Sequence, residues 1–460
     1  MQLPFLNRNQ ETNRLKAMFG NGEGGFACIY GRRRCGKSRL LREVLPAKSA
    51  VYYVADQREA PLQIESLASE IGRVVQGFSE VQYPTWDALL QRWYQDAPRR
   101  AVLAIDEFPF LVQRSPELPS LLQKYIDQNS GNGKSVVLCG SSQMMMQGLV
   151  LDADAPLYGR ATEILKVSPL KAGWVKKGLS MEEDMEALLA YSLWGGVPRY
   201  WELAAGRGKS WEAYTQLVLD PLGVLHTEPS RLLHDDLRDT AQSFSILSLV
   251  GQGCHRLSEI AGRLGKPSTS LTRPVKKLLD LGLIEKEVPF LADPKSNKRA
   301  LYRISDPFLT TWYKHVLPNR SMLDRGMLQP AKESIIGNYK TTLAACWEKL
   351  AREAAPLLGI QGMVWTPASR WWGSSVEKQP MEIDLLAECM DGKYLMAGEA
   401  KLSVTSKEAS GLLIDLEKKA RLLPFANKYG GIVPMLFTAE CKGKTTSGVL
   451  DAGQVLSVLK

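Results

Sequence analysis

One short segment limits what this chain can fold into. Residues 31–38 have the sequence Gly-Arg-Arg-Arg-Cys-Gly-Lys-Ser, between an apolar run at 26–30 and an amphipathic stretch at 39–45. The spacing is that of a glycine, four residues and then Gly-Lys-Ser. A glycine-rich turn between a strand and a helix points consecutive backbone N–H groups at phosphate oxygens, beside the positive end of the helix. The segment therefore predicts a phosphate-binding loop.

The residues of this loop have distinct expected roles. Lys37 is expected to reach the β- and γ-phosphates of a nucleotide, and Ser38 to ligate Mg²⁺. A thiol inside an electropositive loop favours reactivity, so Cys35 is predicted to be exposed. The predicted nucleotide contacts in this segment are Gly31, Arg34, Cys35, Gly36, Lys37, Ser38 and Arg39.

A second element strengthens this interpretation. Residues 101–107 form an apolar run that ends in Asp106 and Glu107, and such a run is typical of a strand buried in a parallel sheet. At its end, Asp106 would hold Mg²⁺ and Glu107 would polarise the attacking water. Asp-Glu after a strand can also be a helix cap or a solvated loop. Together with the loop, however, it favours a nucleoside triphosphatase that binds ATP and Mg²⁺.

Two further residues are candidates for the same site. The apolar run at 134–140 ends in Ser141 and Ser142. Beside the Asp106 strand, one of these serines would sense the γ-phosphate, although a helix cap is the alternative. Arg160 is a candidate arginine that acts in trans on a neighbouring copy, or else one half of a surface salt bridge. A trans role requires a homo-oligomer, which the sequence leaves open.

The order of patterns predicts an α/β fold. Strand-like runs alternate with helical stretches up to residue 167, which favours a parallel sheet with the ligand outside the carboxyl ends of its strands. A helical region at 181–219 is then interrupted by Trp-Gly-Gly-Val-Pro-Arg-Tyr at 194–200. The glycines and the proline predict a helix break there.

These motifs together resemble a known family. The opening helix, the phosphate loop, Asp106-Glu107, Gly140-Ser141-Ser142, Tyr158-Gly159-Arg160 and Gly196-Val197-Pro198-Arg199 are similar to those of archaeal-type ATPases within the STAND class, relatives of AAA+ proteins. The resemblance covers residues 1–230. It implies a nucleotide-gated switch, with a P-loop core at 1–170 and a helical lid at 171–235.

The next region has the pattern of a winged helix. Helical stretches at 243–251, 257–264 and 268–281 precede strand-like runs at 283–288 and 300–304. The third stretch carries Arg273, Lys276 and Lys277, and the loop between the strands carries Lys295, Lys298 and Arg299. This order predicts a winged helix at 236–320 whose third helix can enter the major groove of DNA. Pro274 requires that helix to begin near Ser270 or to kink. Packing between domains, without DNA, is the alternative.

The last region, 331–460, contains a hairpin signal. Asp391-Gly392 lies between two alternating apolar stretches and predicts a two-residue type I′ turn. That turn pairs Met390 with Lys393. Counting outward then places Asp384 opposite Glu399 and Glu382 opposite Lys401, with the four side chains on one face of the sheet. Facing carboxylates repel unless a cation offsets their charge.

This constellation resembles the PD-(D/E)XK restriction-endonuclease-like nucleases. The resemblance implies that Asp384, Glu399 and Lys401 carry metal and phosphodiester chemistry, with Glu348 on the preceding helix as a further metal ligand. Mg²⁺ is the expected cation, and Mn²⁺ is the alternative at this site. A surface ion pair between Glu382 and Lys401, on a sheet that only binds a partner, is the alternative without catalysis.

The bulk composition agrees with several domains. A chain of 460 residues exceeds one hydrophobic core, and its seven cysteines are scattered without a C-x-x-C pair, so neither a disulfide framework nor a zinc site is expected. No apolar run is long enough for a membrane span, and no signal peptide is evident, so we expect a cytoplasmic protein. The net charge of +9 is compatible with DNA as a partner but does not establish one.

Three functions therefore remain open from sequence. The first is an ATP-hydrolysing switch that controls a DNA-binding, metal-dependent nuclease domain. The second is a regulatory or defence switch whose last domain binds nucleic acid or protein without cleavage. The third is a chaperone-like ATPase.

Overall fold

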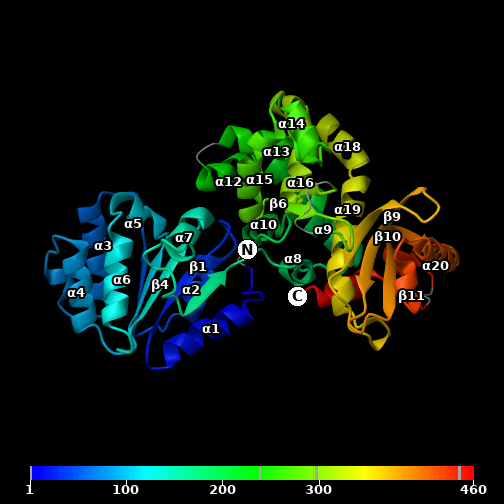
Figure 1. The fold of residues 1–460 in the computed structure, drawn as a ribbon. Helices are drawn as coiled ribbons and strands as arrows, with labels where there is room; N and C mark the ends of the chain where they lie inside the picture. The colour runs from blue at the N-terminus through cyan, green and yellow to red at the C-terminus, as the bar shows by residue number, and fades with distance from the viewer. Residues whose placement is uncertain (1–2, 238–239, 294, 296–298, 444–446) are drawn as a thin grey trace. The chain divides into compact units, whose positions relative to one another are not determined.

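The computed structural model describes residues 3–237, 240–293, 295, 299–443 and 447–460. The chain divides into two compact units, Asn7–Pro169 and Leu170–Lys460, and the second also includes the residues before Asn7. Each unit contains a five-stranded sheet (Figure 1). Within the described residues, no helix is both long and apolar enough to cross a membrane.

The N-terminal unit, Asn7–Pro169, is built on a parallel sheet. Its strands are β1 (Gly25–Tyr30), β2 (Ala50–Val54), β3 (Val102–Asp106), β4 (Ser135–Gly140) and β5 (Glu163–Lys166). Their order is β2-β3-β4-β1-β5 and every pairing is parallel. The apolar runs expected to be strands are strands, so the predicted α/β fold with a parallel sheet is confirmed.

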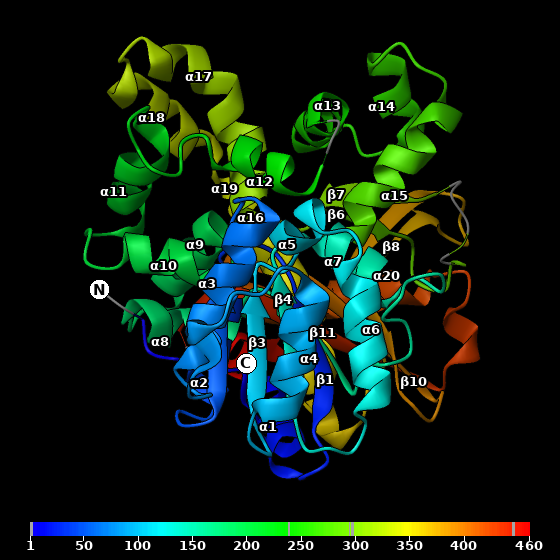
Figure 2. The ribbon, with the colours of Figure 1, turned by 90° about the vertical axis from the view of Figure 1, so that its left-hand side faces the viewer.

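Helices cover both faces of this sheet. They are α1 (Asn9–Gly20), α2 (Lys37–Val44), α3 (Ala60–Gly72), α4 (Trp86–Asp96), α5 (Pro109–Arg114), α6 (Leu118–Gln128) and α7 (Gln143–Val150). Helices α3, α4 and α6 lie on one side of the sheet and α1 on the other (Figures 1 and 2). Because both faces are covered, polar side chains of the central strands are left to the strand ends.

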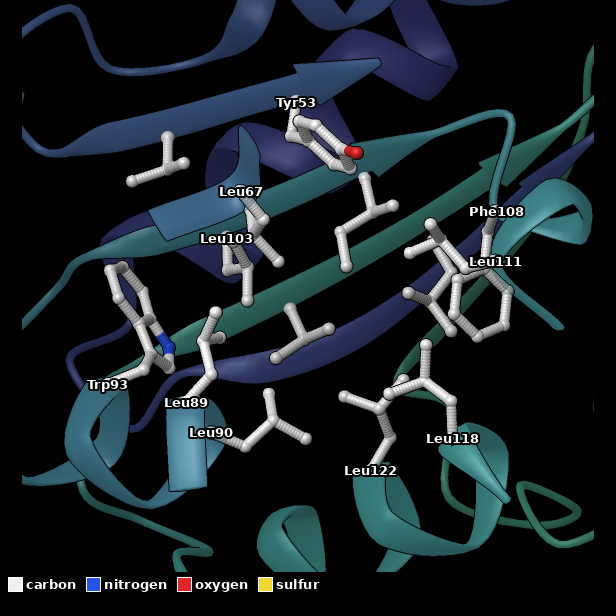
Figure 3. Close-up of a cluster of buried hydrophobic side chains, with 14 of the residues drawn as sticks. Tyr53, Leu67, Leu89, Leu90, Trp93, Leu103, Phe108, Leu111, Leu118 and Leu122 are labelled. Atoms are coloured by element: carbon white, nitrogen blue, oxygen red, sulfur yellow. The ribbon is translucent and has the colours of Figure 1, made fainter. Parts of the chain in front are cut away.

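A hydrophobic core of this unit lies under α3, α4 and α6. Leu67 and Leu89 are fully buried beside Leu103 of the central strand β3, and Leu122 is fully buried in the same cluster (Figure 3). Burying a leucine side chain stabilises the fold by about 1.5–3 kcal/mol. This packing fixes the strands in register, and their carboxyl ends therefore meet along one edge.

The C-terminal unit begins with a helical region. Its helices are α8 (Val175–Leu179), α9 (Asp184–Trp194), α10 (Pro198–Ala204), α11 (Ser210–Tyr214) and α12 (Glu228–Asp236). The predicted helix break is present between α9 and α10, where Gly195 has φ 60° and Pro198 opens α10. Proline is tolerated there because the first turn of a helix has no partner for its N–H.

Gly196 shows why this break needs glycine. Its carbonyl accepts a 2.7 Å hydrogen bond from the backbone N–H of Leu170. A Cβ at position 196 would lie 1.8 Å from the carbonyl oxygen of Leu170. No side chain therefore fits at this position.

A helix and hairpin module follows. It consists of α13 (Thr240–Gly251), α14 (Leu257–Arg263), α15 (Thr272–Asp280) and the antiparallel strands β6 (Ile284–Glu287) and β7 (Leu301–Ile304). A 3₁₀ turn at Ser268–Leu271 precedes α15, so Pro274 falls in the first turn of α15 and does not kink it. Arg273 and Lys276 are exposed and Lys277 is half-buried. Lys298 lies outside the described residues.

Four helices lead to the second sheet. They are α16 (Pro307–Thr311), α17 (Leu317–Asp324), α18 (Leu328–Asn338) and α19 (Lys340–Ala354). The sheet has the order β12-β11-β10-β9-β8. Its elements are β8 (Ser369–Ser374), β9 (Pro380–Glu388), β10 (Tyr394–Thr405), α20 (Ser406–Arg421), β11 (Gly431–Lys442), β12 (Val449–Leu450) and α21 (Ala452–Val458).

The predicted β-hairpin is present, with a different turn. Strands β9 and β10 pair from Glu388 and Leu395 to Leu385 and Gly398, in the predicted register. The connection, however, has four residues: Cys389 N bonds Tyr394 O at 2.9 Å and Gly392 N bonds Cys389 O at 2.8 Å. Of residues 390–393, only Gly392 has positive φ, whereas a type I′ turn requires it at both central positions. The predicted turn is wrong, and Met390 does not pair with Lys393.

We predict that Gly196→Ala destabilises the C-terminal unit by more than about 2 kcal/mol, because backbone must move to relieve the overlap with Leu170. The measurement is the denaturant midpoint. The matched control is Gly411→Ala within α20, where a Cβ meets nothing within 4 Å. That change should be neutral or stabilising, by up to about 1 kcal/mol. Equal midpoints for both variants would contradict the packing argument.

Candidate nucleotide site and acidic pocket

The predicted phosphate loop connects β1 to α2. Gly36 caps α2 with φ 93°, a left-handed conformation that glycine adopts without strain. The Lys37 side chain is 4% exposed. Its ammonium donates to the carbonyl oxygens of Gly31 at 2.8 Å and Arg32 at 3.2 Å. The lysine side chain therefore lies along the loop. Backbone N–H groups and the buried Lys37 cation are thus found together at the start of α2.

Arg8 holds this loop from outside the motif. Its side chain is 7% exposed, donates to Cys35 O at 3.3 Å and also donates to Ser168 O. The guanidinium thus ties the loop to the segment after β5. Arg8 was not among the site residues predicted from sequence. An arginine before a helix carries no distinctive pattern, so nothing in the sequence pointed to it.

Tyr52 on β2 was not predicted, and it connects two site residues. Its hydroxyl donates to Asp106 Oδ2 at 2.8 Å and hydrogen-bonds the Ser38 side chain. Burial, and next the Asp106 carboxylate, raise the pKa of Tyr52 to about 12. Ser38 and Asp106 therefore lie on either side of one hydroxyl. A serine hydroxyl and a carboxylate are oxygen ligands of the kind that Mg²⁺ prefers.

Glu107 and Ser141 also come together. The Ser141 hydroxyl donates to Glu107 Oε1 at 2.6 Å, and the Ser141 N–H lies 3.3 Å from Oε2. Glu107 has φ 54°, a sparsely populated conformation for a non-glycine residue, and residues held in such conformations cluster at functional sites. Ser142 caps α7, accepting from the Met145 N–H. One serine of the pair is thus a helix cap, and the other contacts the predicted catalytic glutamate.

The three predicted arginines of the nucleotide site, Arg34, Arg39 and Arg160, lie in different parts of the N-terminal unit. Arg34 has φ 68° within the loop, and Arg39 lies 3.7 Å from Glu43 on α2. Arg160 forms an ion pair with Asp127 at 2.8 Å. With Gly25 and Phe26, it borders a pocket at the amino end of β1. The phosphate loop follows the opposite end of that strand, so Arg160 does not reach the loop of its own unit.

The expectation of an exposed thiol at Cys35 is wrong. The residue is 1% exposed. The loop wraps inward and places Cys35 against the body of the unit, while Arg8 covers its carbonyl. A cysteine in a phosphate loop can face either the ligand or the core, and the motif does not distinguish these.

In the C-terminal unit, the predicted acidic residues share one pocket. A cavity of about 270 Å³ opens where the pairing of β9 with β10 stops, after Leu385 and Gly398. Its lining includes the five charged residues named from sequence, together with Lys419 and two apolar side chains: Glu348, Glu382, Asp384, Glu399, Lys401, Lys419, Ile383 and Leu416. Residues of both strands border this cavity, but the ladder between β9 and β10 ends at Leu385 and Gly398, so the predicted pairs Asp384–Glu399 and Glu382–Lys401 lie beyond it.

Protein groups already satisfy these carboxylates. Asp384 Oδ2 accepts from the Ala400 N–H at 3.0 Å, and the Lys401 ammonium lies 2.7 Å from Glu399 Oε1. Burial, with a contribution from Glu399, raises the pKa of Asp384. Burial and then Asp384 raise the pKa of Glu348. The carboxyl groups are therefore close enough to repel one another.

Arginines that sequence analysis missed complete the pocket's surroundings. Arg352 donates to the Asp384 carbonyl at 3.0 Å and lies 4.0 Å from Glu348. Arg370 donates to Glu382 at 2.6 Å, so the alternative pair of Glu382 with Lys401 does not form. Throughout the described part of the chain, no three His, Cys, Asp or Glu side chains are grouped so as to hold a metal ion. The predicted trio of Glu348, Asp384 and Glu399 is accordingly not assembled as a metal centre.

Comparison with known proteins agrees with the first site. Residues 5–203 match the model of an ATPase domain found predominantly in Archaea. The fold resembles the Walker-type ATPase of Pyrococcus abyssi with a TM-score of 0.52 and 19% identity, over 67% of this chain and 95% of that one. The parallel sheet, the loop and this match define a P-loop ATPase domain, and the chain is thus an ATPase. The predicted resemblance to archaeal-type ATPases is confirmed for residues 5–203.

Two further matches carry no assigned activity. Residues 312–412 match a family of archaeal and bacterial proteins of unknown function. The whole chain is similar to an uncharacterized protein of Methanocaldococcus jannaschii, with 28% identity over 438 residues, 93% of this chain and 95% of that protein. The two regions therefore occur together in a protein of similar length.

The burial of Cys35 predicts that it reacts slowly in the native protein. Alkylation followed by mass spectrometry should modify Cys254 and Cys441, which are half-buried, roughly tenfold or more faster than Cys35, because a covered thiol must wait for local opening. In denaturant, the three should react alike. Rapid native labelling of Cys35 would contradict the described loop conformation.

Proposed function

We propose that the chain is an ATP-driven switch whose C-terminal sheet carries a nuclease-like site for DNA. The observation that supports this most is the single pocket that contains Glu348, Asp384, Glu399 and Lys401. Asp on one strand and Glu-x-Lys on the next is the arrangement of PD-(D/E)XK nucleases. ATP turnover in residues 7–169 would control this pocket.

In the ATPase domain, each residue has a proposed task. Lys37 would bind the β- and γ-phosphates, since its ammonium already lies along the loop. Ser38 and Asp106 would hold Mg²⁺, and the Tyr52 hydroxyl between them supports this pairing. Bound Mg²⁺ neutralises phosphate charge. Glu107 would orient the attacking water, and Ser141, bonded to it, would respond to loss of the γ-phosphate.

In the acidic pocket, Asp384 and Glu399 are proposed to hold a divalent cation, with Glu348 as a further ligand from α19. A cation there would offset the repulsion between these carboxyl groups. Lys401 would stabilise the negative charge that develops on the phosphate when water attacks and the P–O bond breaks.

The helix and hairpin module is proposed to be a winged helix. The exposed Arg273 and Lys276 on α15 support contact with DNA phosphates. Arg299, however, donates to the Trp372 carbonyl, so part of the hairpin loop packs on the C-terminal sheet. Arg160, paired with Asp127, is retained as a proposed trans-acting arginine in a homo-oligomer.

One observation favours a second function, binding without cleavage. Within the described ranges no three acidic or imidazole side chains are grouped for a metal ion, and Lys401 and Arg352 neutralise the pocket directly. In this alternative, the sheet binds nucleic acid or protein and the ATPase regulates that binding.

We predict that Glu107→Gln lowers the ATPase rate about 100-fold or more while ATP binding is retained, because the amide cannot accept a proton from water. Lys37→Ala should weaken ATP binding itself. Phosphate release and nucleotide titration measure the two effects. The matched control is Glu117→Gln, an exposed position of the same unit, which should leave both unchanged. A Glu107→Gln enzyme with normal turnover would exclude the assigned role.

We predict that the purified protein nicks supercoiled plasmid with Mg²⁺ or Mn²⁺, and that Glu399→Gln and Asp384→Asn each reduce nicking about 100-fold or more. Assays with and without ATP test whether the two sites are coupled. The control is Glu440→Gln, at an exposed residue of β11 outside the pocket. This variant should nick plasmid normally. If DNA binds equally to wild type and variants without nicking, the binding function replaces the nuclease. ATPase stimulation by unfolded protein, and not by DNA, would favour the chaperone-like alternative.

A further inference from the structure

A second and larger cavity lies in the C-terminal unit. It has a volume of about 430 Å³ and is bordered by the end of α13, strand β7, the start of α16 and one side of α19. This volume is within the range of small-molecule sites, about 300–1,000 Å³. Of the predicted site residues, Glu348 alone is among its described lining residues. The proposed functions do not use this cavity.

Its charged lining is mostly cationic. Six charged side chains border the cavity, four of them basic: Arg303, Lys314, Lys349, Arg352, Glu285 and Glu348. Lys349 is neutralised by Glu285 at 2.7 Å and also donates to the Ser305 carbonyl. Arg303 pairs with Glu287 at 2.7 Å. Glu285 and Glu287 therefore hold these two cations at the wall of the cavity.

Lys314 differs from Lys349 and Arg303 in the groups that it contacts. Its ammonium donates to the Thr341 hydroxyl at 3.3 Å, and among the described residues no carboxylate lies within ion-pair distance of it. Burial, and then the positive charge of Arg303, lower the pKa of Lys314. Lys314 therefore contributes a positive charge beside Arg303, which also borders the cavity and keeps its own ion pair with Glu287. An anion placed there would gain charge-assisted hydrogen bonds from both.

The rest of the lining provides apolar contact. Val250, Ile304 and Pro307 border the cavity, and Ala345 contributes an exposed methyl from α19. Pockets that bind small organic molecules combine such apolar walls with a few polar groups that orient the ligand. The cavity thus offers a cationic end and an apolar body.

We propose that this cavity binds a small organic phosphomonoester, with its phosphate between Lys314 and Arg303 and its apolar part against Val250, Ile304 and Pro307. A phosphate dianion matches two cations better than a monoanionic carboxylate does, and the guanidinium binds two phosphate oxygens at once. The site is separate from the phosphate loop, whose residues all belong to the other unit.

The probe is phenyl phosphate, with phenol and benzoate as comparisons. Calorimetric titrations use the full chain carrying Lys37→Ala, so that the phosphate loop does not capture the ligand. Phenyl phosphate should bind with one equivalent, while phenol and benzoate should bind at least tenfold more weakly. In the same background, Lys314→Gln should weaken phenyl phosphate binding about tenfold or more, and Lys314→Arg should retain it.

Two further variants keep the test independent of folding. Lys407→Gln, an exposed lysine on α20, should bind phenyl phosphate as the parent does. Ala345→Trp should block the cavity without burying a new group, and should abolish binding while the melting temperature stays unchanged. The proposal is overturned if phenyl phosphate does not bind at millimolar concentration, if Lys314→Gln and Ala345→Trp bind it normally, or if benzoate binds equally well.

Discussion

Where strand pairing stops is the constraint on which both units depend. In the N-terminal sheet every strand is paired in parallel between two layers of helices, so polar groups remain at the carboxyl ends. Asp106, Glu107 and Ser141 all occupy such ends. In the C-terminal sheet, β10 continues its parallel pairing with β11 as far as Thr405, whereas β9 leaves at Leu385.

The separation of β9 from β10 creates the acidic pocket. Beyond Gly398 an N–H of β10 would lose its ladder partner, and the carboxylate of Asp384 accepts the Ala400 N–H instead. A buried N–H without an acceptor costs free energy, so this one hydrogen bond both terminates the ladder and fixes the orientation of Asp384. The Asp384 side chain therefore both ends the strand pairing and lines the acidic pocket.

Sequence patterns predicted the features that depend on apolar runs or on counting residues along the chain. Continuous apolar runs predicted the parallel strands, and residue counting predicted the register of β9 and β10. The register survived an incorrect turn because two- and four-residue connections centred on the same point keep the same opposing residues. Contacts between distant segments were not predictable: Arg8 with Ser168, Tyr52 with Asp106 and Arg352 with Asp384 depend on packing. The inward direction of Cys35 likewise depends on the core beneath the loop.

The charged groups of the C-terminal unit form a connected set. Glu287 on β6 contacts Arg303 at 2.7 Å, Arg370 at 3.7 Å and Arg352 at 3.9 Å. Burial alone would raise the pKa of Glu287, but Arg303 and then the other two arginines lower it overall. This carboxylate therefore stays ionised and joins the hairpin to β8 and to α19, and α19 borders the acidic pocket.

Helix α19 lies beside two cavities of the C-terminal unit, and this position bears on whether they influence each other energetically. Trp347 anchors it by donating to the Phe437 carbonyl at 3.0 Å, and the adjacent Glu348 borders both the acidic pocket and the larger cavity. A carboxylate with two neighbours responds to a charge arriving on either side. Linkage makes such a response reciprocal: whatever factor one occupant imposes on the affinity for the other is returned in full. A single turn of α19 thus provides a direct route by which charge in one cavity can affect the other.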